Sequence, residues 1–174
     1  GEQIKECTFI VNGMSKAYAM TGWRIGYCAG PRREIAAMVA FQSQATSNAN
    51  SIAQHASAIA LNSDQSCVTE MVKHFEERRN VMVEKINAIP GISCKKPEGA
   101  FYVMMNIDAL VGKTLGGKVI NDGSDFAMAF LEKENVALVP CGGFGEPNYL
   151  RWTYATSMED IQKGLDRLEK FLAE

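Results

Sequence analysis

The 174-residue sequence lacks the marks of several protein classes. No apolar run reaches the ~18 residues that a membrane span needs, and residues 1–6 have no secretory signal pattern. The sequence also has no large excess of positive or negative charge, because it contains 18 Lys and Arg and 20 Asp and Glu. The formal net charge of −2 gives no general attraction for nucleic acid or an anionic membrane. We therefore expect neither a nucleic-acid partner nor a membrane partner, and a cytoplasmic location by default.

Cysteine and histidine are too few and too scattered for a metal site. The five cysteines are odd in number, and no two of them form a C-x-x-C pair. This pattern is typical of reduced thiols, and it excludes a disulfide framework and a paired-cysteine zinc site. His55 and His74 belong to no H-E-x-x-H pattern, so we expect no metal ligand.

Hydrophobic periodicity predicts a helix-rich first half. Two short buried strands, Cys7–Val11 and Arg24–Ala29, flank a loop over residues 12–23. Three helices follow over about 31–45, 52–61 and 66–88, and Pro90-Gly91 ends the third helix. One pair of strands is too little sheet for a complete doubly wound domain, so we expect further sequence upstream of Gly1.

The second half has a mixed pattern of strands and helices. Ser157 and Asp160 form a capping box, which predicts that a last helix begins there. The composition changes near Pro90, which predicts one domain over residues 1–89 and a compact α+β domain over 90–174. The elements expected here are strands over 92–95, 100–107, 136–139 and 149–154, a helix over 124–134, a Gly-rich surface loop over 112–123, and an apolar stripe of Ile161, Leu165, Leu168 and Leu172 in the last helix.

Chemically useful side chains concentrate in residues 12–27. Lys16 lies in the loop between the two expected strands, and Arg24 opens the second strand. An amine and a guanidinium placed in this way can surround one anion, and an amine there can also attack a carbonyl carbon. The spacing alone leaves open that both are solvated surface charges.

The stretch S-K-A-Y-A-M-T-G-W-R-I-G-Y over residues 15–27 resembles the lysine motif of the class I/II aminotransferases. These are fold-type I pyridoxal-phosphate (PLP) enzymes, and the similarity is greatest to the aspartate-aminotransferase-like subgroup. Further stretches match in the same order, over 44–54, 97–102, 136–140 and 149–157. The resemblance implies an α/β fold, the C-terminal portion of a PLP-transferase fold. Residues 1–89 would form the end of the large cofactor domain with a long connecting helix, and 90–174 the α+β small domain.

The same resemblance assigns roles to four residues. Lys16 would be the Schiff-base lysine and would also move a proton at the substrate's α carbon. Arg24 and Ser15 would bind the cofactor phosphate, although Ser15 could equally cap a local turn. Arg151 would bind the substrate's α-carboxylate. Residues 46–51 resemble a loop that lies near the neighbouring subunit's site, which implies a homodimer.

The implied reaction moves an amino group between an aspartate-like amino acid and a 2-oxo acid, in amino acid biosynthesis. Many family members carry a second serine where this sequence has Gly13. Whether the phosphate has a second hydroxyl ligand here is therefore an open question. The family's aspartate for the pyridine nitrogen and its ring-stacking aromatic precede the lysine motif, and residues 1–15 match neither. We therefore expect the chain to correspond to the C-terminal half of such an enzyme and to be inactive alone. Two alternatives stay open: a fold-type I C–S lyase, and a non-catalytic module that retains the motif.

Overall fold

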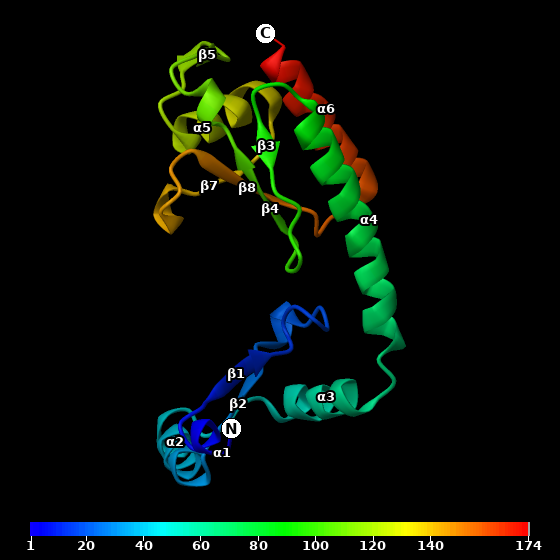
Figure 1. Cartoon of the computed structure of the whole chain (residues 1–174). Coiled ribbons are helices and arrows are strands. Elements are labelled where there is room, and N and C mark those ends of the chain that lie inside the picture. Colours follow the sequence, from blue (N-terminus) through cyan, green and yellow to red (C-terminus); the bar gives the residue numbers. More distant parts are fainter. Residues whose placement is uncertain (174) are drawn as a thin grey trace. The chain divides into compact units, whose positions relative to one another are not determined.

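The computed structural model describes residues 1–173, apart from the side chain of Glu2. The chain divides into two compact units, Gly1–Glu70 and Met71–Glu174, which are taken one at a time below (Figure 1). The division falls near the start of helix α4 (Ser66–Ala88). The sequence placed a domain boundary at the other end of this helix, and that division into a cofactor domain and a small domain stays a prediction.

The first unit contains a two-stranded antiparallel sheet and three helices. Strand β1 (Ile10–Gly13) pairs with β2 (Gly26–Ala29), and Gly13 lies opposite Gly26. The remaining elements are α1 (Glu2–Lys5), the 3₁₀ turn η1 (Thr21–Trp23), α2 (Arg32–Ala45) and α3 (Ser51–Asn62). Asn50 caps α3, because its side-chain oxygen accepts hydrogen bonds from the first amides of that helix.

The expectation that the two strands of this unit are buried is wrong for the described residues. Ile10 and Val11 of β1 are 59% and 79% exposed, and Tyr27 of β2 is 42% exposed. The strands also begin later than expected, at Ile10 and Gly26. An apolar run shows which side chains can be buried, but burial also needs packing partners, and within residues 1–173 this sheet has two strands only.

The second unit is built around a four-stranded antiparallel sheet in the order β3-β4-β8-β7. Its strands are β3 (Ser93–Cys94), β4 (Tyr102–Asn106), β7 (Val139–Pro140) and β8 (Tyr149–Thr153). One face of the two central strands is fully buried, since side chains alternate across a strand. The residues of this inward face are Val103, Met105, Leu150 and Trp152.

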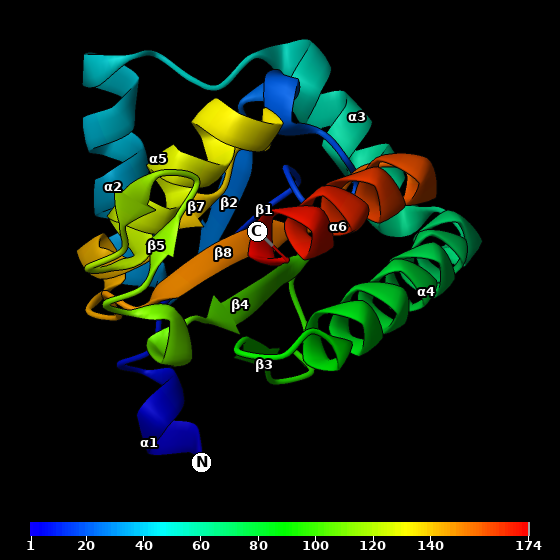
Figure 2. The same cartoon turned by 90° about the horizontal axis from the view of Figure 1, so that it is seen from above.

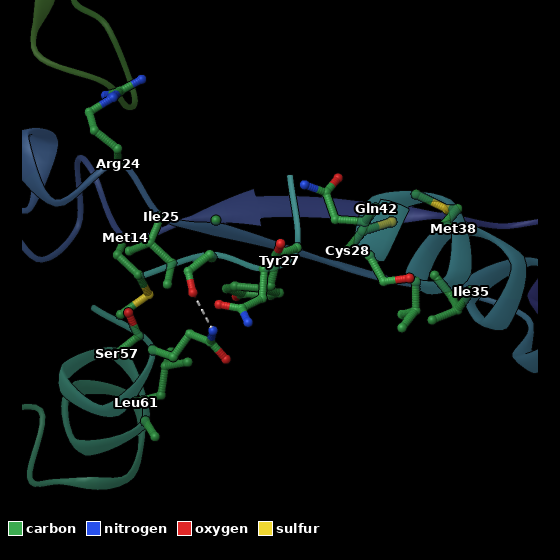
Figure 3. Close-up of a pocket in the computed structure, with 18 residues that line it drawn as sticks. Met14, Arg24, Ile25, Tyr27, Cys28, Ile35, Met38, Gln42, Ser57 and Leu61 are labelled. Atoms are coloured by element: carbon green, nitrogen blue, oxygen red, sulfur yellow. Dashed lines mark hydrogen bonds between the residues drawn. The ribbon is translucent and has the colours of Figure 1, made fainter. Parts of the chain in front are cut away.

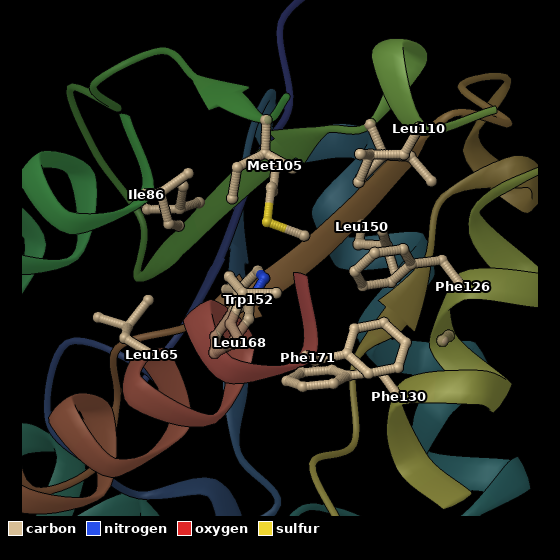
Figure 4. Packing of buried hydrophobic residues seen from close by; sticks show 14 of the residues in the cluster. Ile86, Met105, Leu110, Phe126, Phe130, Leu150, Trp152, Leu165, Leu168 and Phe171 are labelled. Carbon is tan, nitrogen blue, oxygen red and sulfur yellow. The ribbon is translucent and has the colours of Figure 1, made fainter. Parts of the chain in front are cut away.

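Helices α4, α5 (Gly123–Glu134) and α6 (Met158–Leu172) cover that inward face. Figure 4 shows Ile86 of α4, Phe130 of α5 and Phe171 of α6 packing around Trp152 and Leu150. The helices α4 and α6 lie side by side (Figure 2), and the Lys85 amine lies 2.8 Å from the Asp166 carboxylate between them. This arrangement leaves the opposite face of the sheet outside the core.

Several local predictions for the second unit agree with the structure. The α4 bounds coincide with the expected helix, and Ser157 caps α6, with the Asp160 amide 3.0 Å from the Ser157 hydroxyl. The expected apolar stripe is buried except at its last position, where Phe171 rather than Leu172 is the fully buried residue. None of the described helices has the length and apolar character to cross a membrane.

Two expectations for this unit are wrong. The Gly-rich stretch 112–123 is not only surface loop, because it contains a hairpin of β5 (Thr114–Leu115) and β6 (Lys118–Val119). Leu115 and Ile120 anchor this hairpin in the core, and their burial outweighs the loop composition. The strand expected over residues 136–139 is reduced to Val139–Pro140.

Two short 3₁₀ turns complete the unit, η2 (Asp108–Leu110) and η3 (Gly142–Phe144).

Candidate functional site

The loop with the lysine motif leaves and re-enters the β1–β2 sheet at a single point. The last pair of the ladder is Gly13 opposite Gly26, and the Met14 amide donates a hydrogen bond to the Ile25 carbonyl just beyond it. A Cβ atom on Gly26 would lie 2.8 Å from the Asn12 carbonyl oxygen, which no real side chain tolerates. Glycine at position 26 therefore allows the close approach that brings both ends of the loop together.

This closure brings Ser15, Lys16 and Arg24 to the same end of the sheet. Lys16 is exposed and lies three residues beyond β1, whereas Arg24 is exposed and lies two residues before β2. Ser15 is half-buried, and its hydroxyl has no hydrogen-bond partner among residues 1–173. The three residues predicted to bind the cofactor thus share one loop, as their spacing requires.

The backbone around Arg24 is held in an uncommon conformation. Arg24 adopts φ 52° and ψ 50°, the left-handed region, where a non-glycine residue costs on the order of 1 kcal/mol. Its Nη1 donates a 2.8 Å hydrogen bond to the Thr21 carbonyl. Figure 3 shows its side chain pointing away from Met14 and Leu61. In the part of the chain that the structure describes, no carboxylate lies within ion-pair distance of this guanidinium.

A pocket of about 760 Å³ lies beside this loop within the first unit. It is lined mainly by apolar side chains of β2, α2 and α3, among them Ile35, Met38 and Leu61 (Figure 3). Arg24 also lines the pocket, but neither Ser15 nor Lys16 does. The structure therefore does not gather the predicted cofactor residues around this particular pocket.

Arg151 lies in the second unit, on the outward face of strand β8. It is opposite Met104 of β4, and its two neighbours along the strand, Leu150 and Trp152, point into the core. Arg151 is half-buried, and its Cζ lies 4.3 Å from the centre of the Tyr102 ring and 5.3 Å from that of Phe144. Among the described residues it has no carboxylate partner. An arginine in this state is suited to an anion from outside the chain.

A buried thiol lies near Arg151. The Cys141 sulfur is 3.8 Å from the Met104 sulfur and 3.6 Å from the Val139 carbonyl oxygen. Burial raises the pKa of this thiol, and the positive charge of Arg151 opposes that rise in part. The thiol is therefore neutral near pH 7 and places no negative charge beside Arg151. Over residues 1–173, His, Cys, Asp and Glu side chains form no group of three or more that could hold a metal ion.

Tyr102 and Phe144 are neighbours of Arg151 that sequence reasoning missed. The signal for Tyr102 was present, because it lies in the stretch 97–102 that resembles the aminotransferases. Period-two alternation also places it on the same strand face as Met104. No comparable signal marks Phe144, which lies in a Gly-rich loop whose path only the folded chain reveals.

Comparison with known proteins identifies the family. The family model "Aminotransferase class I and II" matches residues 2–168. An aspartate/prephenate aminotransferase of Nitrosomonas europaea is 45% identical over 172 residues, and an aspartate aminotransferase of Rhizobium meliloti is 47% identical over 166. These alignments cover 98% and 95% of this chain but 43% and 40% of the relatives, so the chain spans about two fifths of their length.

Solved structures agree with the sequence comparison. The crystal structure of the Rhizobium meliloti aspartate aminotransferase matches with a TM-score of 0.94 at 44% identity, over 99% of this chain and 44% of that one. The Thermotoga maritima aspartate aminotransferase matches with a TM-score of 0.81 at 37% identity, over 95% of this chain and 40% of that one. The matched portion is the C-terminal part, which confirms the expected fold class. The chain belongs to the class I and II aminotransferase family, whose members use pyridoxal phosphate.

Proposed function

We propose that this chain contributes part of the active site of a PLP-dependent aminotransferase. The reaction transfers an amino group between an aspartate-like amino acid and a 2-oxo acid. The observation that carries the proposal is the closure at Gly13 and Gly26, which brings Lys16, Arg24 and Ser15 to one end of the sheet. The names of the relatives support aspartate as the type of substrate.

The side chains at this loop fit the chemistry of pyridoxal phosphate. A phosphate monoester needs cationic and hydroxyl donors, and Arg24 and Ser15 supply a guanidinium and an unpartnered hydroxyl. An aldehyde needs an amine, and Lys16 supplies one on an exposed loop. When bound, the cofactor supplies an aldehyde that combines with amines and a ring that draws electrons from the substrate's α carbon.

Each proposed residue then has a defined physical role. Lys16 would hold the cofactor through Nζ, and the same amine would move a proton at the substrate's α carbon. Arg24 holds the phosphate, and its backbone conformation and bond to Thr21 fix the guanidinium in advance. Arg151 binds the α-carboxylate and so orients the bonds at the α carbon.

The wider setting follows from the same resemblance. We propose residues 1–89 as the end of the large cofactor domain, 90–174 as the small domain, and a homodimer with residues 46–51 near the neighbouring subunit's site. Five free cysteines in the described chain favour a reducing compartment such as the cytoplasm. Residues 1–15 offer no match to the family's remaining cofactor contacts, so the 174-residue chain alone is expected not to transaminate.

Covalent labelling tests the proposal directly. The chain is mixed with pyridoxal phosphate and reduced with borohydride, and the labelled lysines are located by peptide mass spectrometry. We expect a selective adduct on Lys16 that Lys16→Ala abolishes, whereas Lys5→Ala, a change at another exposed lysine of the same unit, leaves it in place. Arg24→Gln should weaken labelling by pyridoxal phosphate but not by pyridoxal, which has no phosphate.

Scattered labelling of surface lysines, or equal effects of Arg24→Gln on both reagents, would contradict the proposal and favour a non-catalytic module. If Lys16 is labelled selectively, the reaction class is decided by the products of a protein that joins this chain to the family's remaining cofactor contacts. Pyridoxamine phosphate with a keto acid indicates transamination, whereas pyruvate released with ammonia indicates a C–S lyase.

A further inference from the structure

The outward face of the second unit's sheet places an aromatic ring beside Arg151. Tyr102 of β4 is paired with Thr153 of β8, and Arg151 is paired with Met104. Tyr102 and Arg151 are therefore diagonal neighbours on one face, within reach of long side chains. The buried core lies on the other face of the sheet. The Tyr102 ring also contacts the ring of Phe101, which packs against that core, with 4.5 Å between the ring centres.

Two rings lie against the Arg151 guanidinium. Its Cζ is 4.3 Å from the ring centre of Tyr102 and 5.3 Å from that of Phe144, both within the range of a cation–π attraction. We refer to Tyr102 and Phe144 as the aromatic pair.

The loop that carries Phe144 is held by its own backbone. The Phe144 and Glu146 amides donate to the Cys141 carbonyl at 2.8 and 3.1 Å, and the Cys141 amide donates to the Tyr149 carbonyl at 2.9 Å. These bonds tie η3 to the start of β8, the strand that also carries Arg151. Phe144 as a residue is 60% exposed, so apolar burial does not explain its position beside the guanidinium.

We propose that the aromatic pair positions Arg151 for its carboxylate ligand. The inference rests on the proposed function, in which Arg151 binds the substrate's carboxylate. A ring attracts a cation through its face and uses none of the five N–H donors at the guanidinium edge. An aspartate or glutamate in the same place would occupy those donors and compete with the ligand. The aromatic pair therefore orders the side chain while the donor edge stays open for a carboxylate.

The size of the effect follows from the entropy of ordering. Immobilising one long side chain on binding costs about 0.5–1.5 kcal/mol, which corresponds to about a two- to tenfold change in affinity. A guanidinium that is already ordered avoids much of this cost. Loss of either ring should therefore weaken carboxylate binding by about two- to tenfold.

The test uses propionate as the probe and the 174-residue chain, followed by NMR of the arginine Nε–Hε signals. Propionamide, which has the same shape without the charge, serves as the ligand control, and Arg151→Gln identifies the site. We expect Tyr102→Leu and Phe144→Leu each to weaken propionate binding, whereas Tyr102→Phe keeps the ring and the affinity. Tyr149→Leu removes an aromatic side chain from the same face of β8 and should leave the affinity unchanged.

A second readout is specific to ring contact. Protons of the Arg151 side chain that lie over the aromatic rings should show upfield ring-current shifts. These shifts should become smaller in Tyr102→Leu and in Phe144→Leu, because each variant keeps one ring, and they should persist in Tyr102→Phe. A purely structural role for these residues would not produce this pattern. Should Tyr102→Leu unfold, Phe144→Leu carries the test, because its ring lies on an exposed loop.

The outcomes separate the two claims. Propionate binding that depends on Arg151 but is insensitive to both leucine variants would overturn the positioning role and leave the proposed function intact. Propionate binding that Arg151→Gln does not affect would overturn the carboxylate role of Arg151 and this inference with it.

Discussion

Replacement of Gly123 by alanine should destabilise the second unit through one close contact. Gly123 is the first residue of α5 and is buried, and its amide donates a 2.7 Å hydrogen bond to the Pro147 carbonyl. A Cβ atom there would lie 2.8 Å from the Tyr149 carbonyl oxygen and 2.9 Å from that of Pro147. Both of these are backbone atoms, so no side-chain rotation can relieve the overlap.

The magnitude follows from these distances. Ordinary contact begins at 3.4 Å, so the 2.8 Å approach requires α5 and the start of β8 to separate by about 0.6 Å. Overpacking of this kind costs about 1–3 kcal/mol. Alanine also reduces the conformational freedom of the unfolded chain, which offsets about 0.4–1 kcal/mol. We expect the free energy of unfolding of the second unit to fall by about 1–2 kcal/mol.

Urea denaturation followed by tryptophan fluorescence measures this change. The chain has two tryptophans, Trp23 in the first unit and the buried Trp152 in the second. In a Trp23→Phe background the signal therefore reports on the core beneath β8 alone. Gly143→Ala is the matched control, because a Cβ atom at Gly143 meets nothing within 4 Å. Equal stabilities for the two alanine variants would refute the reasoning.

Three further predictions concern the same unit. Phe130 is fully buried against Phe126, Trp152 and Phe171, so Phe130→Ala should lower the free energy of unfolding by about 3–5 kcal/mol in the same urea assay, and Phe130→Leu by less. The hydrogen bond from the Ser157 hydroxyl is the main cause of the lowered pKa of Asp160. The ionised Asp160 carboxylate therefore stabilises the fold above pH ~4, and this stabilisation is lost as the pH falls through the lowered pKa. Thermal melts at a series of pH values should show this loss of stability in acid, and Asp160→Asn should abolish this part of the pH dependence. The same pH dependence in Asp160→Asn as in the parent chain would contradict the assignment. Burial raises the pKa of Cys141, so iodoacetamide should modify it far more slowly at pH 7.5 than the exposed Cys67, as peptide mass spectrometry would show.

Elements with strong local signals could be predicted from the sequence. The helix α4 and the start of α6 were found at the right residues, because periodicity and the Ser157–Asp160 capping box act over a few positions. The β5–β6 hairpin could also have been found. Gly116 and Gly117 both have positive φ, and such a pair between Leu115 and Lys118 is a two-residue turn signal hidden within a Gly-rich stretch.

Features that depend on distant residues could not be predicted in the same way. The exposure of Ile10 and Val11 depends on which partners cover β1, and the residues themselves do not reveal this. The candidate site shows the same limit. The stretches that resemble the aminotransferases indicated Lys16, Arg24 and Arg151. The contact between Tyr102 and Arg151, however, joins neighbouring strands through residues that are 49 positions apart in the sequence. Only the register of β4 against β8 determines that contact.

The alternation along β8 has a consequence for insertions and deletions. Leu150 and Trp152 point into the core, whereas Arg151 between them points away from it. A one-residue insertion or deletion within Tyr149–Thr153 would exchange these two directions downstream of the change, placing a charge in the core and apolar side chains outside. The length of the preceding loop is not restricted in this way, because its residues do not alternate between two faces. Length variation among functional homologues should therefore concentrate before Tyr149 and be absent from the five residues of the strand.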